Sequence, residues 1–270
     1  MSYKSKLTSP LVQTDAEFRR SCITKDRNGI LTTGYIQRDW NKQPAGTIEC
    51  CDAFDPSWLI PRSDWDAIIE QREKDQSTLK QLGLDAGIRT ISQNGVPHCW
   101  AFGSVRAVEL VEVIGGELHV PLSPTSVACV AKNWRKVGGN TFDTIPVMSK
   151  RGVVPESIWG INDFNRGLDN EEAWREAAPF KLKRWMELPR NNFDAAASLL
   201  LRGFPVILGV PWGMGAHMIC GTDLKALGGG KYGIEIWNSH GTSYGDNGFA
   251  VLSERQATAF DQVACMMTEV

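Results

Sequence analysis

The pattern of hydrophobic and polar positions separates the first 86 residues from the rest of the chain. Residues 1–62 are polar and interrupted by glycine and proline, which predicts an irregular N-terminal arm with short strands and no long helix. Residues 63–86 are charged, with a capping pattern at Ser63 and Asp66 and a terminating glycine at Gly83. We therefore expect this segment to form one solvated surface helix, inserted ahead of the main body.

Residues 87–204 are predicted to form a mainly helical lobe. From Cys99 to Gly115 the chain is small or apolar, which is typical of a mostly buried central helix. One narrow polar stripe interrupts it, formed by Arg106, Glu109 and Glu112. Two further helices are predicted at residues 123–136 and 141–151.

After Pro205 the pattern changes to short alternating or apolar runs broken by glycine. Strands are predicted at residues 206–210, 217–222, 232–237 and 249–253. The three glycines at 228–230 fit a hairpin between the second and third of these strands. Residues 205–270 are therefore expected to be an antiparallel β lobe, which makes the chain an α+β protein with one domain.

Composition limits the partners and the location. With 270 residues, of which 42% are hydrophobic, the chain can bury a core as one domain or as two small lobes. A net charge of −2 and a pI near 6.1 argue against nucleic acid or an anionic membrane as partners. No apolar run approaches the roughly 20 residues that span a bilayer, and the N-terminus lacks the apolar region of a signal peptide. We expect a cytoplasmic protein.

The seven cysteines agree with that location, because their odd number and irregular spacing do not form a disulfide framework. The adjacent Cys50 and Cys51 lack the CxxC or HxxxH spacing of a zinc site. We expect no metal and no cofactor.

Cys99 lies where a loop becomes the central helix, and this position suits a nucleophile. Unpaired N–H groups and the helix dipole stabilise a thiolate at a helix N-terminus. Gln93, six residues earlier, carries an amide donor that could join the Cys99 N–H in holding an oxyanion. The alternative is an inert core cysteine.

Two later segments contain the other groups that a thiol acyl-transfer site needs. His217 follows two small residues, and Asn238 follows a predicted strand, so the chain has the order Cys, His, Asn. His217 would act as the base, and Asn238 would fix its tautomer and orientation. Taken alone, His217 could equally be a satisfied core histidine.

With these blocks the sequence resembles the papain family of cysteine peptidases. The matching residues are Gln93, residues 99–102, His217, Asn238 with Ser239, and residues 241–249, and the resemblance spans about residues 87–252. It implies a two-lobed papain-like fold with a helical lobe, a β-barrel-like lobe and a catalytic cleft between them. It also implies a peptide or protein substrate.

The resemblance assigns further residues to substrate binding. Gly138 and Gly139 would offer backbone groups to an extended peptide, as an added strand does, although a simple turn is the alternative. Residues expected to shape the pocket for the second residue before the cut are Gly215, Ala216 and Met218. His240 replaces an aromatic residue that usually shields the His–Asn contact, and we place it on the same side of the site.

Several positions depart from the family pattern. Pro97 replaces a glycine and removes a backbone N–H, and His98 beside the nucleophile is expected on the surface. Val96 and Val137 stand where the family has a disulfide. The connection between Pro205 and His217 is short, so a hairpin beside the cleft is expected to be missing. The arm also lacks the family's helical inhibitory pro-region.

Three functions follow from these patterns. The first is an intracellular thiol peptidase that uses Cys99, His217 and Asn238 with a thioester intermediate. The second is a papain-fold acyl transferase or amidase, since the same thiol site serves either reaction. The third is a non-catalytic scaffold in a larger assembly, which would also hold the N-terminal arm.

Overall fold

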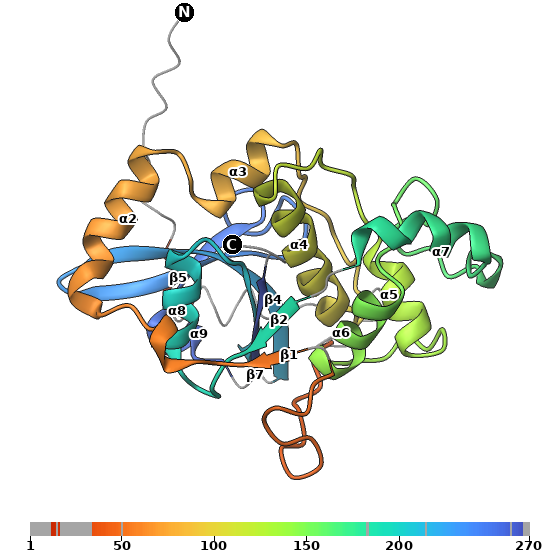
Figure 1. Cartoon of the computed structure of the whole chain (residues 1–270), viewed down its shortest axis with the longest axis horizontal. Helices are drawn as coiled ribbons and strands as arrows, with labels where there is room; N and C mark the ends of the chain where they lie inside the picture. The colour runs from red at the N-terminus through yellow and green to blue at the C-terminus, as the bar shows by residue number, and fades with distance from the viewer. Residues whose placement is uncertain are drawn as a thin grey trace, which may run out of the picture.

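One mixed sheet with helices packed on it forms the described part of the chain (Figure 1). A computed structural model describes residues 12–14, 16, 34–49, 51–181, 184–213, 215–259 and 261–266. About half of the predicted arm, namely residues 1–11, 15, 17–33 and 50, lies outside these residues.

The sheet has seven strands in the order β1-β2-β7-β3-β4-β5-β6. The strands are β1 (Cys51–Ala53), β2 (Arg184–Glu187), β3 (Val206–Trp212), β4 (Gly215–Gly228), β5 (Lys231–Trp237), β6 (Phe249–Ser253) and β7 (Asp261–Met266). All neighbours pair antiparallel except β1 with β2. Because β1 and β6 lie at opposite edges, these strands form an open sheet and not a closed barrel.

The four strands predicted after Pro205 are confirmed as β3 to β6, and β4 and β5 pair on either side of the predicted glycine hairpin. Two described strands, β2 and β7, were not among those predicted, and β2 comes from the region expected to be helical, whereas β1 lies in the arm, where short strands were expected. Residues 87–204 therefore contribute to the sheet as well as to the helices.

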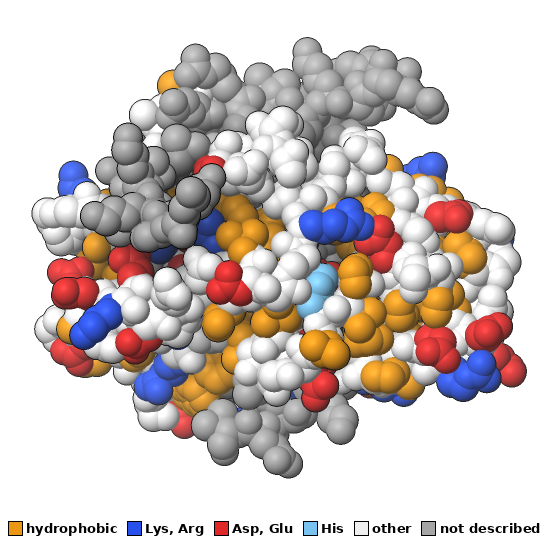
Figure 2. Space-filling view, turned by 90° about the horizontal axis from the view of Figure 1, so that it is seen from above, with side chains coloured by type: hydrophobic (Ala, Val, Ile, Leu, Met, Phe, Trp, Pro, Cys, Tyr) orange, Lys and Arg blue, Asp and Glu red, His pale blue; other side chains and the backbone are white. Residues whose placement is uncertain are grey.

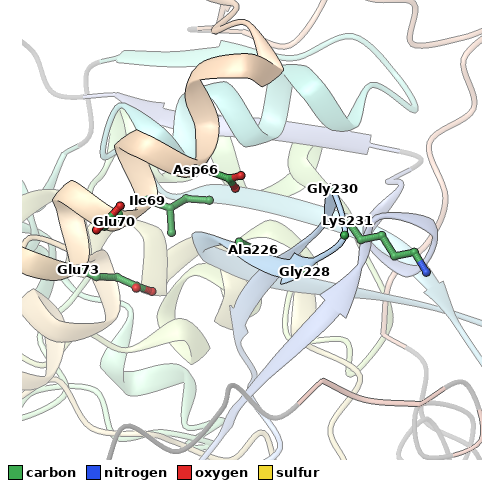
Figure 3. Close-up of a pocket in the computed structure, with 9 residues that line it drawn as sticks. Asp66, Ile69, Glu70, Glu73, Ala226, Gly228, Gly230 and Lys231 are labelled. Carbon is green, nitrogen blue, oxygen red and sulfur yellow. The ribbon is translucent and has the colours of Figure 1, made fainter.

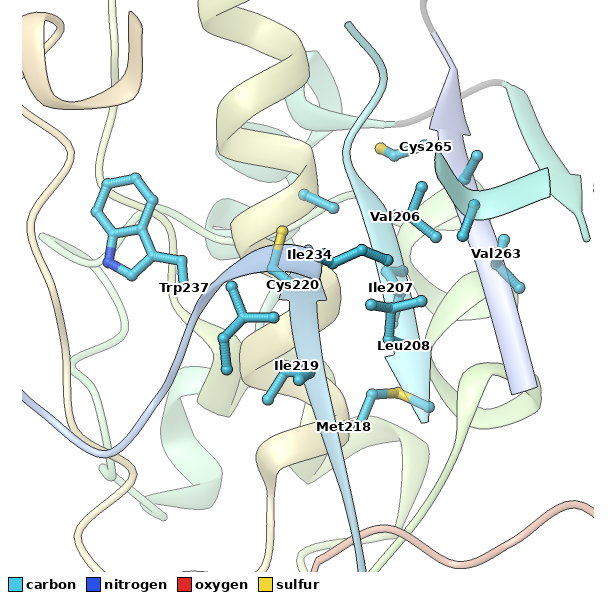
Figure 4. Close-up of a cluster of buried hydrophobic side chains, with 14 of the residues drawn as sticks. Val206, Ile207, Leu208, Met218, Ile219, Cys220, Ile234, Trp237, Val263 and Cys265 are labelled. Carbon is cyan, nitrogen blue, oxygen red and sulfur yellow. The ribbon is translucent and has the colours of Figure 1, made fainter. Parts of the chain in front are cut away.

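The central helix α4 (Cys99–Ile114) is confirmed, and it packs between β4 and two further helices, α5 (Pro124–Ala131) and α6 (Thr141–Lys150). Gly103 allows the close approach, since a Cβ there would lie 3.1 Å from the Ile219 carbonyl carbon. Apolar side chains of β3, β4 and β7 gather beside α4 (Figure 4). The helix predicted over 123–136 is shorter, because the backbone turns left-handed at Asn133 and Trp134.

The single helix expected over residues 63–86 is in fact two helices, α2 (Trp65–Lys74) and α3 (Leu79–Asp85). A positive φ of 53° at Gln76 breaks them, and Thr78 caps α3 by accepting from the Gln81 N–H. Gly83 does not end a helix but lies inside α3, where a Cβ would be 2.9 Å from the Leu110 and Trp237 side chains. The predicted capping at Ser63 is also wrong, since Asp64 is the N-cap and makes no capping bond.

The other helices among the described residues 51–266 are short. They are α7 (Glu171–Ala177), α8 (Phe193–Leu201), α9 (Glu254–Ala257) and the 3-10 turns η1 (Pro56–Trp58), η2 (Arg62–Asp64), η3 (Arg166–Leu168) and η4 (Ala178–Phe180). Figure 1 shows α2 and α7 at opposite ends of the molecule, with α4 between them.

The surface mixes charges of both signs with apolar side chains on the face seen in Figure 2. Within the described ranges, no helix combines the length and the apolar character that crossing a bilayer requires.

Candidate active site

Cys99 is the first residue of α4, and its side chain is fully buried. The loop before it is held by Gln93. The Gln93 N–H donates to the Ser239 carbonyl at 2.9 Å, and the Gln93 Oε1 accepts from the Ser239 hydroxyl at 2.6 Å. The Gln93 Nε2 donates to the Val96 carbonyl at 2.7 Å. The loop that precedes the thiol is thus tied directly to the residue that follows Asn238.

His217 and Asn238 are in hydrogen-bond contact, with 2.8 Å between His217 Nε2 and Asn238 Oδ1. His217 is in β4 and Asn238 directly follows the neighbouring strand β5, in which Trp237 pairs with Cys220 of β4. Both residues are buried, and the Asn238 N–H donates to the Gly248 carbonyl at 2.9 Å. The sequence therefore predicted a pair that the fold brings together.

The Cys99 thiol contacts the backbone of β4 at the residue after His217. The backbone of Met218, the residue after His217, is among the groups that lower the pKa of Cys99. Contacts therefore run from the Gln93 loop to Ser239, from Asn238 to His217, and from Met218 to Cys99. The three sequence blocks converge at the N-terminus of α4.

Burial controls the electrostatics of the site. It raises the pKa of the Cys99 thiol to about 12, against the smaller opposite effects of the Met218 and Gly34 backbone. Burial also lowers the pKa of His217 well below its usual value, and the neighbouring His240 lowers it further. In this conformation burial keeps the Cys99 thiol protonated and disfavours the charged form of His217, so the thiol is not activated.

Aromatic rings surround the His217–Asn238 contact. The ring of Trp212 lies 4.7 Å from that of His217 and 6.0 Å from that of His240, between centroids. The rings of His217 and His240 are also 4.7 Å apart, and the ring of Tyr244 is 5.7 Å from His240. Sequence reasoning missed Trp212, whose only signal was a lone tryptophan at the end of the strand before His217.

The two glycines expected to bind substrate backbone meet the chain's own N-terminal segment, residues 34–49, which we call the strap. The Gly139 N–H donates to the Gly34 carbonyl at 2.9 Å, and the Ile36 N–H donates to the Gly139 carbonyl at 3.0 Å. Gly138 lies close to the same part of the strap, because a Cβ at Gly138 would be 2.6 Å from the Gly34 carbonyl oxygen. The backbone edge at Gly139 is occupied.

The strap also covers the thiol. Gly34 contributes one of the backbone groups that lower the pKa of Cys99. A Cβ on Gly34 would lie 2.5 Å from the carbonyl carbon of Pro97, two residues before the thiol. Only glycine fits this crossing, and the crossing helps to bury Cys99 completely.

The residues expected to shape a pocket near His217 lie along the start of β4. Gly215 pairs with Trp212, Ala216 packs partly buried against the core, and the Met218 side chain is buried within the core. Figure 4 shows Met218 among the apolar side chains of the sheet.

His98 is not on the surface as expected, because only 1% of it is exposed. Its ring lies 5.7 Å from Trp100 and 5.8 Å from Phe164, and burial lowers its pKa to about 4. Phe164 is distant in sequence, so the local pattern gave no indication of this cover.

A separate cavity of about 270 Å³ lies between α2 and the β4–β5 turn (Figure 3). Asp66, Glu70 and Glu73 line it on the helix side, and Lys231 lies at the turn. Glu73 already pairs with Lys225 at 2.9 Å. This cavity shares no residue with the Cys99 region.

Comparison with known proteins gives structural matches only, since no family model and no curated protein matches the chain. Matching solved structures include papain-like cysteine proteases, and the chain has the papain-like fold. At 14–21% identity the likeness concerns the fold alone.

Three of these structures illustrate the match. Xylellain, a cysteine protease from Xylella fastidiosa, has a TM-score of 0.58 and 15% identity over 68% of this chain and 84% of that chain. A recombinant stem bromelain precursor has a TM-score of 0.66 and 18% identity over 97% of this chain and 85% of that chain. Bromelain from Ananas comosus with the E64 inhibitor has a TM-score of 0.55 and 21% identity over 70% and 98%.

Proposed function

We propose that this chain is a papain-like thiol peptidase that cleaves peptide bonds with Cys99, His217 and Asn238. The 2.8 Å contact between His217 and Asn238, beside a cysteine at the N-terminus of α4, carries the proposal. In this interpretation α4 to α6 form one lobe, the sheet forms the other, and the substrate lies in a cleft between them. The papain-like fold supports the class of reaction.

In this proposal each group has a role. Asn238 holds His217 at Nε2, which leaves Nδ1 to take the thiol proton. The thiolate attacks the peptide carbonyl, and the Cys99 N–H with Gln93 stabilises the oxyanion. Protonated His217 gives its proton to the leaving amine, and water then hydrolyses the thioester.

The covered thiol fits a closed form of this peptidase. A neutral, fully buried Cys99 cannot reach a substrate, and the strap occupies the backbone edge that a substrate needs. The match to a precursor extends over 97% of the chain, against 70% for bromelain with E64, and this supports treating the N-terminal part as a precursor-like segment. Activity therefore requires the strap to move.

Labelling with an epoxysuccinyl thiol-protease probe, read by mass spectrometry, tests the proposal. We expect selective modification of Cys99, slow in the native chain and faster in Arg38→Ala, which removes an ion pair of the strap. His217→Ala should abolish the selectivity, and Cys99→Ala is the blank. If Cys99 reacts no faster than the other thiols in either background, the peptidase proposal is wrong.

A further inference from the structure

The strap places one aromatic side chain in a pocket beside Gly139. Tyr35 forms a bridge with Gly139, and only 5% of it is exposed. An extended peptide bound at the same edge would place one of its own side chains where Tyr35 now lies. The surroundings of Tyr35 therefore describe a side-chain pocket of the site.

Gly209 on β3 forms the floor of this pocket. A Cβ at Gly209 would lie 2.6 Å from Tyr35 Cζ and 2.9 Å from its hydroxyl oxygen, so the end of the ring rests on the glycine. Any larger residue would shorten the pocket. Glycine at this position makes the pocket deep enough for a long side chain.

Asp261 stands next to that floor. It pairs directly with Gly209 in the β3–β7 register, so its side chain leaves the same face of the sheet. Only 1% of Asp261 is exposed. Its Oδ2 accepts from the Thr141 hydroxyl at 2.7 Å, whereas its Oδ1 has no hydrogen-bond partner. The Tyr35 hydroxyl also lacks a partner, and after burial the charge of Asp261 is the main cause that raises the pKa of Tyr35.

The positive charge that acts on Asp261 is Arg38 of the strap, and Arg190, outside the strap, acts on the Tyr35 hydroxyl in the same pocket. Arg38 Nη1 lies 3.9 Å from Asp261 Oδ1 and is also ion-paired with the buried Glu187. When the strap leaves, the phenol of Tyr35 and the guanidinium of Arg38 leave together. The pocket then presents a buried carboxylate that has lost this ion pair.

We propose that the Tyr35 pocket is the specificity pocket of the site, and that Asp261 makes it select a substrate residue with a basic side chain. This inference rests on the proposed peptidase function. A desolvated carboxylate is stabilised most by a charged donor, and arginine or lysine is long enough to reach it across Gly209. Glu187, which also loses Arg38, adds negative charge nearby.

Peptide binding tests the pocket without requiring catalysis. Full-length Cys99→Ala protein that also carries Tyr35→Ala and Arg38→Ala lacks the ring and the guanidinium that fill the pocket and loosens the strap, and its site is inert. Two fluorescent peptides would be compared by anisotropy, one with arginine and one with citrulline, its neutral isostere, at the tested position. We expect arginine to bind about tenfold more tightly or better, as for one charge-assisted hydrogen bond.

Asp261→Asn in the same background keeps the shape and the Thr141 contact but removes the charge, so the two peptides should then bind equally. Gly209→Val should weaken both peptides together, because it fills the floor. Thermal unfolding would verify that each variant is folded. Three outcomes would each overturn the inference. They are equal binding of the two peptides before the Asn substitution, an unchanged preference for arginine after it, and no binding of either peptide. The labelling of Cys99 described above is independent, so the peptidase proposal can fail or survive separately.

Discussion

Two segments that precede α4 are held by carboxylates of the body, and they differ in how deeply they are built into it. In the strap, Arg38 pairs with Glu187 and approaches Asp261. In the α2–α3 segment, Asp223 accepts from the Leu79 and Lys80 N–H groups at 2.9 and 3.0 Å. The chemistry of attachment is similar in the two cases.

Their apolar contacts are not similar. Trp65 and Leu79 of the α2–α3 segment are fully buried in the main core. The strap has two apolar side chains in that core, Tyr35 and Ile48, with a pair of backbone bonds to Gly139 and one buried guanidinium, whereas the α2–α3 segment also buries Ile69 there. Segments with few buried apolar contacts open at a small fraction of the global unfolding free energy. We infer that the helices are permanent structure and that the strap is a separable cover.

Arg38→Ala should have the largest effect on the difference between the strap and the α2–α3 segment. The strap loses its ion pair, and two buried carboxylates lose their partner, which costs about 3–5 kcal/mol for a buried pair and favours release. We expect the rate of Cys99 labelling to rise roughly 100-fold. Lys80→Ala is the matched control, since Lys80 donates to Glu235 at 2.8 Å in the other segment. A comparable rise in the control would mean that the strap has no special role.

Asp223→Ala should show the opposite pattern to Arg38→Ala, with a loss of overall stability and no change in the accessibility of Cys99. One buried and one partly buried backbone donor at the start of α3 lose their acceptor, so the free energy of unfolding should fall by about 2–3 kcal/mol. Chemical denaturation would measure that loss. Cys99 labelling under native conditions should stay unchanged, and a large increase would show that both segments control the thiol.

Asp261→Asn tests whether the carboxylate next to the strap makes the stability of the fold depend on pH. Burial raises the pKa of Asp261 to about 6 from an ordinary value of 3.8. The folded state therefore binds the proton more readily than the unfolded state, and Asp261 stabilises the fold at low pH and loses that contribution as pH rises through about 6. Between pH 4.5 and 7, native stability relative to the Asn variant should fall by about 2 kcal/mol. Denaturant titrations at both pH values measure this difference, and a pH-independent difference would contradict it.

A pair of glycine substitutions gives the finest comparison. Gly34→Ala places a Cβ against the Pro97 backbone, which cannot move aside, so the strap should lift and labelling should rise about tenfold. Gly83→Ala meets Leu110 and Trp237 and should lower the free energy of unfolding by about 1–2 kcal/mol without exposing the thiol. Equal labelling rates in the two variants would remove the distinction between the segments.

The parts of the fold that were predicted correctly have a local signal. The α4 helix has a long apolar pattern, and β3 to β6 have short apolar runs separated by glycine. His217 and Asn238 were found because their chemistry requires particular residue types in a particular order. Their contact then follows from the β4–β5 register.

The missed parts depend on distant partners. The strand β2 has only four residues, and it pairs with β7 and with β1, which are about 80 and about 130 residues away along the chain. The strap meets Gly139 through backbone atoms, which leave no trace in a side-chain pattern. The burial of His98 under Phe164 is likewise a contact between residues far apart in sequence.

The covalent link between the strap and the rest of the chain sets its strength as a competitor. A tethered ligand acts at an effective concentration on the order of millimolar, which an ordinary dilute substrate cannot match. One break in the backbone between the strap and β1 would end that advantage, because the freed segment would compete only at its own bulk concentration. Release of the strap would then become irreversible on dilution, and a single backbone cut would decide when the site becomes accessible.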